Sequence, residues 1–104
     1  MDERVNVETL DVRNNVEGKR FEVVLGDEVA MVQYYRDGDI IAYTHTEVPT
    51  GYEGQGIAEK MVKVALDYAR ENQLMVAPFC PFVAAYVKRH PEYQDITIDL
   101  NSLR

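Results

Sequence analysis

The sequence predicts an α/β (α+β) fold, in which a mixed, mainly antiparallel twisted sheet carries one long central helix and one shorter helix. Three observations lead to this class. Strand-like segments joined by short glycine turns fill the first half of the chain, and residues 57–72 then repeat with the period of an α-helix. A short apolar strand, a second helix and a last alternating segment complete the chain. The predicted order is βββ-α-β-α-β.

The first three strands are predicted at residues 21–25, 29–36 and 40–48, which are rich in the β-branched and aromatic types that favour strands. Residues 26–28 form a turn between the first two. Residues 37–39, with the sequence Asp-Gly-Asp, join the second and third, because Asp-Gly readily adopts the positive φ angles of a tight hairpin. We therefore expect an antiparallel meander. The connection between its first two strands leaves no room for a helix.

The long helix is predicted at residues 57–72, where apolar side chains fill one continuous arc and charged ones the opposite arc. Residues 74–77 read as a buried strand. Residues 80–90 form the shorter helix, which begins at Pro81 because proline is favoured at the first helical position. Residues 96–100 alternate apolar and polar types and predict a last strand.

The chain length of 104 residues, 46% of them hydrophobic, predicts a single domain over residues 1–104. Its first 19 residues are polar, with Asn14-Asn15 and Gly18 as turn residues and room for an edge strand. We expect a monomer or a weak homodimer.

The charge balance argues against several partners. The chain has 11 Lys and Arg against 18 Asp and Glu, a net charge of −7, so nucleic acid and anionic membranes are not expected to bind. The longest apolar run, residues 74–87, is broken by two prolines and is too short for a membrane span. The charged N-terminus lacks a secretory signal and the chain has one cysteine, so a cytoplasmic location is expected.

Three glycines, Gly51, Gly54 and Gly56, lie between a strand and the long helix. No Ser, Thr, Asp or Asn stands between Gly51 and Ala58 to cap the helix, which leaves its first amides free to bind an anion. The spacing matches neither the Walker nor the Rossmann phosphate motif. The alternative is a tight turn that binds nothing.

Three residues are candidates for catalysis. Cys80 is predicted at the start of the second helix, where the positive helix end stabilises a thiolate; the alternative is a small buried apolar residue. His45 and Glu47 alternate along their strand, so we expect both on the face of Ile41 and Tyr43, as a general base or as an exposed polar pair. Two such residues are too few to predict a metal site.

Four segments of the chain, in this order and spacing, resemble the small single-domain GNAT-like acetyltransferase proteins. They are His45-Thr46-Glu47-Val48-Pro49, Gly54-Gln55-Gly56-Ile57-Ala58, Pro78-Phe79-Cys80-Pro81-Phe82-Val83 and residues 90–95. The resemblance covers residues 20–100 and implies a minimal GNAT fold that binds acetyl-CoA. Gly54 and Gly56 match the family's pyrophosphate loop, whereas Gly51 stands where Arg or Gln is usual. Cys80 matches a cysteine suggested as an acetyl acceptor in that family.

The resemblance implies acetyl transfer to an amine, either directly or through Cys80, with His45 or Glu47 as the base. Tyr86, two turns into the second helix, is predicted to face the cofactor pocket. Two alternatives remain: a non-catalytic module or sensor that binds CoA or acyl-CoA, and an interaction domain that binds no cofactor. The predicted cofactor-binding residues are Val48, Gly51, Gly54, Gln55, Gly56, Ile57, Ala58 and Tyr86.

Overall fold

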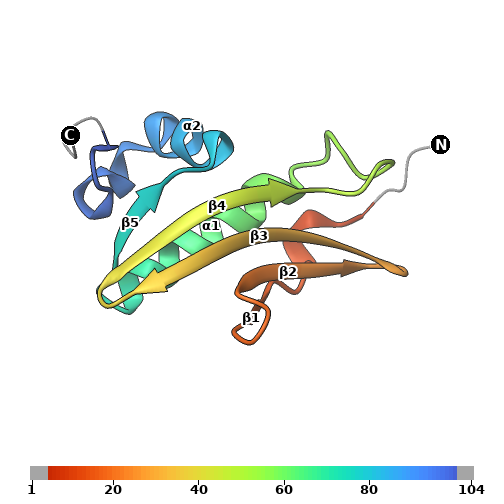
Figure 1. The fold of residues 1–104 in the computed structure, drawn as a ribbon. Coiled ribbons are helices and arrows are strands. Elements are labelled where there is room, and N and C mark those ends of the chain that lie inside the picture. The colour runs from red at the N-terminus through yellow and green to blue at the C-terminus, as the bar shows by residue number, and fades with distance from the viewer. Residues whose placement is uncertain (1–4, 101–104) are drawn as a thin grey trace.

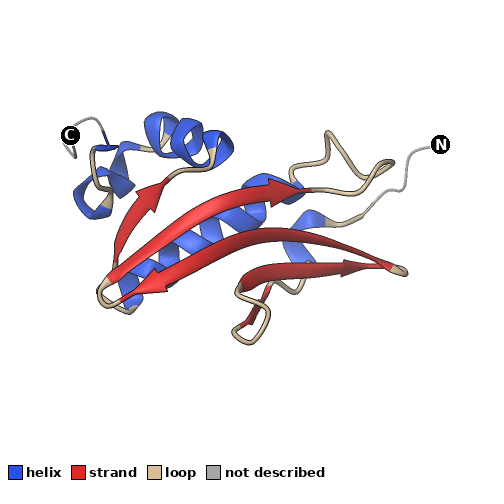
Figure 2. Ribbon diagram, in the orientation of Figure 1, coloured by secondary structure: helices blue, strands red, loops and turns tan. Residues whose placement is uncertain are grey.

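A computed structural model describes residues 5–100, which form one five-stranded sheet with helices against one face (Figure 1). Colouring by secondary structure shows the long helix α1 running behind the strands (Figure 2). The strands are β1 (Arg13–Asn15), β2 (Arg20–Leu25), β3 (Glu28–Asp37), β4 (Ile40–Glu47) and β5 (Met75–Pro78); the helices are α1 (Ile57–Glu71) and α2 (Pro81–Arg89), with 3₁₀ helices η1 (Val7–Thr9) and η2 (Pro91–Ile96).

The strands follow the order β1-β2-β3-β4-β5 in the sheet. The first four pair antiparallel, and β5 joins β4 in parallel after the crossover through α1. The predicted mixed, mainly antiparallel sheet with one long and one short helix is therefore confirmed. Gly26 and Gly38 make the two hairpin turns with φ angles of 65° and 57°, as the sequence predicts.

Helix α1 packs its apolar arc onto the inner face of the sheet. Its fully buried side chains all belong to the arc predicted from the sequence, and they meet sheet residues such as Phe21 and Val32. Tyr43 of β4 is completely buried, and its hydroxyl donates to the carbonyl of Ala65 at 2.6 Å. Without this bond, the buried hydroxyl of the tyrosine would have no hydrogen-bond partner.

A β-bulge interrupts the pairing of β3 with β4. Gln33 pairs with His45, but the next residue, Tyr34, pairs with Tyr43, so Thr44 is an extra residue in β4. An extra residue reverses the inward and outward alternation of every side chain beyond it. Thr46, opposite the buried Val32, therefore faces inward.

The last predicted strand, residues 96–100, is wrong. Its first residue belongs to η2, and only one bridge, between Val76 and Thr97, extends the sheet, with the Ile98 amide donating to the Val76 carbonyl at 2.8 Å. The segment before it is tied to α1, because the Arg70 guanidinium donates to both carboxylate oxygens of Asp95 at 3.0 and 2.9 Å.

The N-terminal segment is more ordered than its composition suggests. Asn14 and Asn15, predicted as turn residues, form the end of the edge strand β1. Their side chains fix them there: Asn14 accepts from the Tyr34 hydroxyl at 2.7 Å, and Asn15 donates to Glu22 at 3.2 Å. The short helix η1, which Asn6 caps by accepting the Glu8 amide at 3.1 Å, was not predicted.

The outer face of the sheet is open. β2 and β3 are joined by two residues, and no helix lies in front of β2, β3 or β4 in Figure 1. Val24 and Tyr35 on this side are 64% and 59% exposed.

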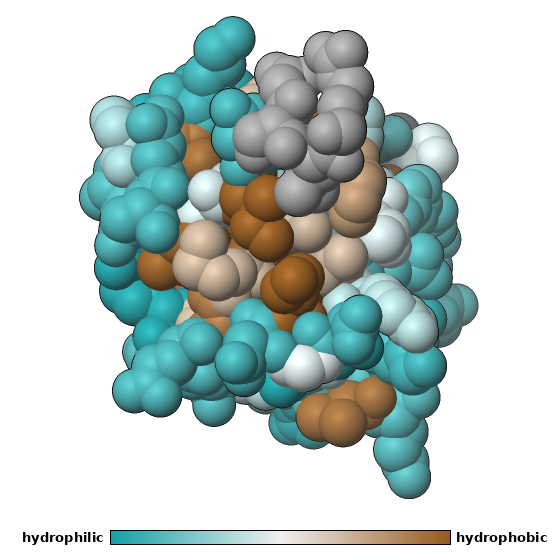
Figure 3. Space-filling model, turned by 60° about the vertical axis from the view of Figure 1, so that its left-hand side comes forward, coloured by the Kyte–Doolittle hydropathy of each residue, from teal (hydrophilic) through white to brown (hydrophobic). Residues whose placement is uncertain are grey.

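Figure 3 shows one end of the molecule, where a small group of hydrophobic residues lies within a hydrophilic surround. Among residues 5–100, no helix is long and apolar enough to cross a membrane.

Candidate functional site

The loop between β4 and α1 is built on three left-handed glycines. Gly51, Gly54 and Gly56 have φ angles of 97°, 80° and 88°, a region that residues with a Cβ rarely adopt. Gly56 is the N-cap of α1, and no side chain caps the helix, as the sequence predicts. Within the described residues, the amides of Ile57, Ala58 and Glu59 have no recorded partner, and the first helical bond runs from the Lys60 amide to the Gly56 carbonyl. This end of α1 can therefore accept an anion.

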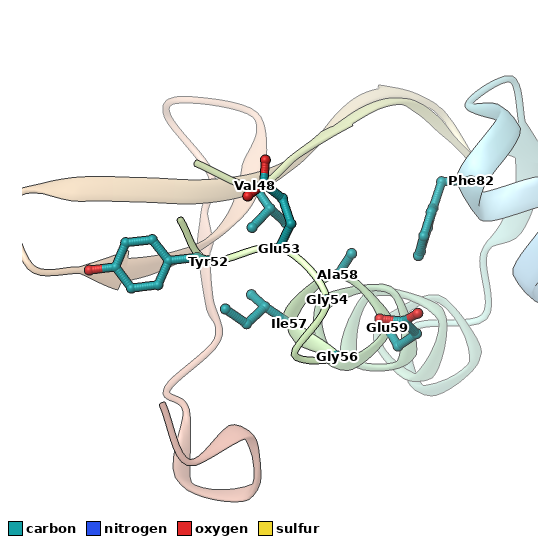
Figure 4. A pocket seen from close by; sticks show the side chains of 9 residues that line it. All are labelled: Val48, Tyr52, Glu53, Gly54, Gly56, Ile57, Ala58, Glu59 and Phe82. Carbon is teal, nitrogen blue, oxygen red and sulfur yellow. The ribbon is translucent and has the colours of Figure 1, made fainter. Parts of the chain in front are cut away.

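A pocket of about 310 Å³ opens at this helix end (Figure 4). The loop forms one side of it, the first turn of α1 forms the floor, and Phe82 reaches over from α2. A Cβ added to Gly54 or Gly56 would meet no heavy atom within 4 Å, so the glycines border open space rather than packed atoms. The residues that line the pocket are Val48, Tyr52, Glu53, Gly54, Gly56, Ile57, Ala58, Glu59 and Phe82.

The pocket carries negative charge of its own. Glu53 and Glu59 line it, and the Glu53 carboxylate accepts the Gly51 amide at 2.9 Å. That carboxylate occupies one of the loop amides that an incoming anion could use. Among residues 5–100, no Lys or Arg lines the pocket, so there an anionic ligand would be held by backbone amides and the helix dipole.

β4 and β5 separate beside this pocket. Their register ends where Tyr43 meets Pro78, while β4 continues to Glu47, so its last four residues have no β5 partner. Cys80 closes the fork, because its amide donates to the Tyr43 carbonyl at 2.8 Å. The free edge of β4 therefore leads from the fork towards the glycine loop and offers backbone groups to an extended ligand.

His45 and Glu47 lie on the outer face, and the prediction that they share the face of Ile41 and Tyr43 is wrong. The bulge at Thr44 is the reason, since it reverses the alternation beyond Tyr43. His45 Nε2 and Glu47 Oε1 are 3.1 Å apart, and the two side chains are 53% and 59% exposed. They form an exposed hydrogen-bonded pair on the open side of the sheet.

Cys80 is the N-cap of α2, as predicted, and is 4% exposed. Its Sγ atom lies 3.3 Å from the Oγ1 atom of Thr46. The thiol therefore sits on the inner side of the fork, with the β4 strand between it and the outward-facing His45 and Glu47. The structure does not bring the three predicted catalytic side chains together.

The predicted cofactor residues divide into two groups. Val48, Gly54, Gly56, Ile57 and Ala58 line the pocket. Gly51 belongs to the same loop but is not among the lining residues, and neither are the other two predicted residues.

Gln55 and Tyr86 form this second group. The side-chain oxygen of Gln55 accepts the Val5 amide at 2.9 Å and thereby ties the loop to the N-terminal segment. Tyr86 is buried and stacks on His90, with ring centroids 4.0 Å apart. Helix α2 turns this tyrosine towards η2 instead of towards the glycine loop.

Sequence reasoning missed Thr46, Tyr52, Glu53, Glu59 and Phe82. Phe82 follows the helix-starting Pro81, and its apolar ring in the first turn of a helix facing a loop was a signal that could have been read. Glu53 lies within the glycine segment itself. Thr46 gave no signal, because only the bulge turns it towards Cys80.

A family model described as GCN5-related N-acetyl-transferase matches residues 20–96 of the chain. Protein NATD1 from Gallus gallus is 33% identical over 85 residues, which cover 79% of this chain and 77% of that protein. Protein NATD1 from Mus musculus is 34% identical over 83 residues, covering 77% and 76%. The NMR solution structure of a GCN5-like protein from Staphylococcus aureus superposes with a TM-score of 0.69 at 26% identity, over 88% of this chain and 90% of that one.

Proposed function

Because the chain belongs to the GCN5-related N-acetyltransferase family, we propose that it moves an acetyl group from acetyl-CoA to an amine acceptor. Family membership supports acetyl transfer in general. The observation that carries the proposal is the uncapped N-terminus of α1, which opens into a pocket beside the free edge of β4. This arrangement offers amides to an anionic group at one end and an extended backbone to a chain-like ligand along the strand.

The pocket is compatible in shape with the pyrophosphate of acetyl-CoA. Open space lies where a Cβ of Gly54 or Gly56 would stand, and the first-turn amides of α1 have no side-chain cap. In this proposal the amides of Ile57 and Ala58 hold the pyrophosphate, and the free edge of β4, which ends just before Val48, holds the pantetheine arm. When bound, acetyl-CoA supplies the acetyl group as an activated thioester.

The acceptor amine reaches the fork from the open outer face of the sheet. There Glu47 and His45, hydrogen-bonded to each other and more than half exposed, can take the proton that an attacking amine must lose. Cys80 lies on the inner side of the fork and supports a second route, in which its sulfur receives the acetyl group first. The net charge of −7 favours a cationic acceptor such as a polyamine or a lysine side chain.

A calorimetric titration with coenzyme A tests the binding step. We expect saturable binding that weakens when Gly56 is replaced, with Gly38→Ala in the remote hairpin turn as the matched control. Absence of binding at millimolar coenzyme A would contradict the proposal and leave an interaction domain as the better description.

Intact-mass measurement after mixing with acetyl-CoA separates the two routes. Acetyl-Cys80 that forms in the wild type and disappears on addition of an amine supports the relay. Turnover of an amine panel by Cys80→Ala at the wild-type rate supports direct transfer, and loss of that turnover in Glu47→Gln then identifies the base.

A non-catalytic module that binds coenzyme A is the second candidate. One observation favours it: none of the three predicted catalytic side chains lines the pocket. Tight binding of coenzyme A together with no turnover across the amine panel, in the wild type as in Cys80→Ala, is the result expected of such a module.

A further inference from the structure

Cys80 is the one cysteine of the chain, and its thiol has one side-chain hydrogen-bond partner among the described residues. That neighbour is Thr46, whose Oγ1 atom lies 3.3 Å from the sulfur. The backbone of Cys80 is fixed independently, because its amide donates to Tyr43 and its carbonyl accepts the Ala84 amide at 3.0 Å. These bonds fix the main chain of Cys80, and Thr46 is the hydrogen-bond partner of its sulfur.

The bulge in β4 creates this contact. Under strict alternation from Tyr43, position 45 would face inward and Thr46 outward. The extra residue, Thr44, reverses this order and turns Thr46 towards the thiol. The contact lies in the fork, where β4 has lost β5 as a partner and where the proposed acetyl transfer takes place.

Threonine suits this position for two reasons. Its β-branched side chain is restricted at χ1 on a strand, so its hydroxyl points in one direction. The hydroxyl can accept a hydrogen bond from the thiol and can donate one to a thiolate, so the same contact serves both forms of the sulfur. The Thr46 hydroxyl has no other recorded partner among residues 5–100.

We propose that Thr46 is the positioning residue of Cys80: in the resting protein the S–H group donates a hydrogen bond to its Oγ1 atom, which sets the direction of the sulfur lone pairs. Its use in turnover rests on the relay route of the proposed function. The hydrogen bond itself does not, and it can be measured without any substrate.

The S–H stretching band in the infrared spectrum tests the contact directly. The chain has one cysteine, so the protein gives one such band, and Cys80→Ala identifies it by its loss. We expect Thr46→Val, which keeps the shape and removes the hydroxyl, to move the band to higher wavenumber and narrow it. Thr46→Ser restores the hydroxyl and should return the band close to its wild-type position.

Thr44→Val is the matched control, because the Thr44 hydroxyl contacts the Gln33 carbonyl at 3.4 Å and not the sulfur. Its S–H band should stay at the wild-type position. If Thr46→Val does not fold, as judged by circular dichroism, Thr46→Ala provides the same readout. A band that is unchanged in the folded variant without the hydroxyl would overturn the proposal.

The rate of Cys80 acetylation by acetyl-CoA, followed by intact mass, gives the second readout. A net hydrogen bond of ordinary strength predicts a rate about threefold to tenfold lower in Thr46→Val, with recovery in Thr46→Ser. If wild-type Cys80 is never acetylated, the relay route fails while the S–H band still decides the role of Thr46. An unshifted band alongside normal acetylation overturns this inference and leaves the proposed function standing.

Discussion

Gly56 is the position where the loop conformation can be tested most directly. It is the N-cap of α1 with φ 88°, and an added Cβ would meet no heavy atom within 4 Å. Gly56→Ala should therefore introduce no steric clash, and its cost should be conformational. The left-handed region destabilises a residue with a Cβ by about 1–2 kcal/mol. Alanine also reduces the conformational freedom of the unfolded chain, which offsets about 0.4–1 kcal/mol of this loss.

The net expectation for Gly56→Ala is a loss of about 1 kcal/mol in the free energy of unfolding, from the difference of those two terms. For a domain of this size that corresponds to a decrease of about 5 °C in Tm, measured by circular dichroism. Relaxing the strained φ angle turns the loop amides away from the pocket. Coenzyme A affinity, measured by calorimetry, should therefore fall by about tenfold, which corresponds to the loss of one hydrogen bond to a charged group.

Gly38→Ala is the control for this experiment. Gly38 also has a positive φ, 57°, and open space around it, but it lies in the β3–β4 turn. It should lose similar stability and keep coenzyme A affinity. Equal loss of affinity in the two variants, or normal affinity in Gly56→Ala at the expected Tm, would refute the role of the loop conformation.

Three further predictions concern other contacts. Tyr43→Phe removes the buried hydrogen bond to the Ala65 carbonyl and should cost about 1 kcal/mol in urea unfolding; an unchanged midpoint contradicts the stabilising role of that bond. Partial burial works against ionisation of Asp67, but hydrogen bonds from the Tyr93 hydroxyl and a lysine outweigh it and lower the pKa of this carboxyl. Because the folded pKa of Asp67 is lower than its unfolded pKa of about 3.9, the ionised carboxylate stabilises the protein above that unfolded value, and this stabilisation is lost as pH falls through the folded value. Asp67→Asn should therefore make Tm fall less steeply towards acid pH than it does in the wild type. A curve of Tm against pH that runs parallel to the wild-type curve would argue against this. Glu53→Gln removes a carboxylate that accepts a loop amide and repels anions. Coenzyme A should then bind about threefold tighter, in line with the about 0.2–1 kcal/mol of an exposed charge interaction. Equal affinity of the two proteins in calorimetry would exclude that repulsion.

Local pattern was sufficient for most of the elements. The bounds of α1 and α2, the hairpin at Gly38 and the missing N-cap before Ile57 all follow from residues within a few positions of one another. Helical periodicity, turn chemistry and capping are properties of the nearby chain, so the sequence carries them in full. The glycine loop before α1 was predictable for the same reason.

Arg70 and Gln55 illustrate why other features could not be predicted. Arg70 reaches 25 residues along the chain to Asp95 and ties η2 to α1. Gln55 accepts the amide of Val5, 50 residues earlier. Neither pairing leaves a trace in local composition, because the energy of a contact depends on which distant groups the fold brings within hydrogen-bonding distance.

The bulge at Thr44 decided the arrangement of the candidate site. By itself, the sequence determined that His45, Thr46, Glu47 and Cys80 lie near the end of a strand and the start of a helix. Tertiary structure alone determined which of them meet, since one extra residue in β4 sends His45 and Glu47 outward and brings Thr46 to Cys80. The physical reason is that side-chain direction in a strand alternates with a period of two, so a bulge set by pairing with β3 inverts every later position without changing the sequence pattern.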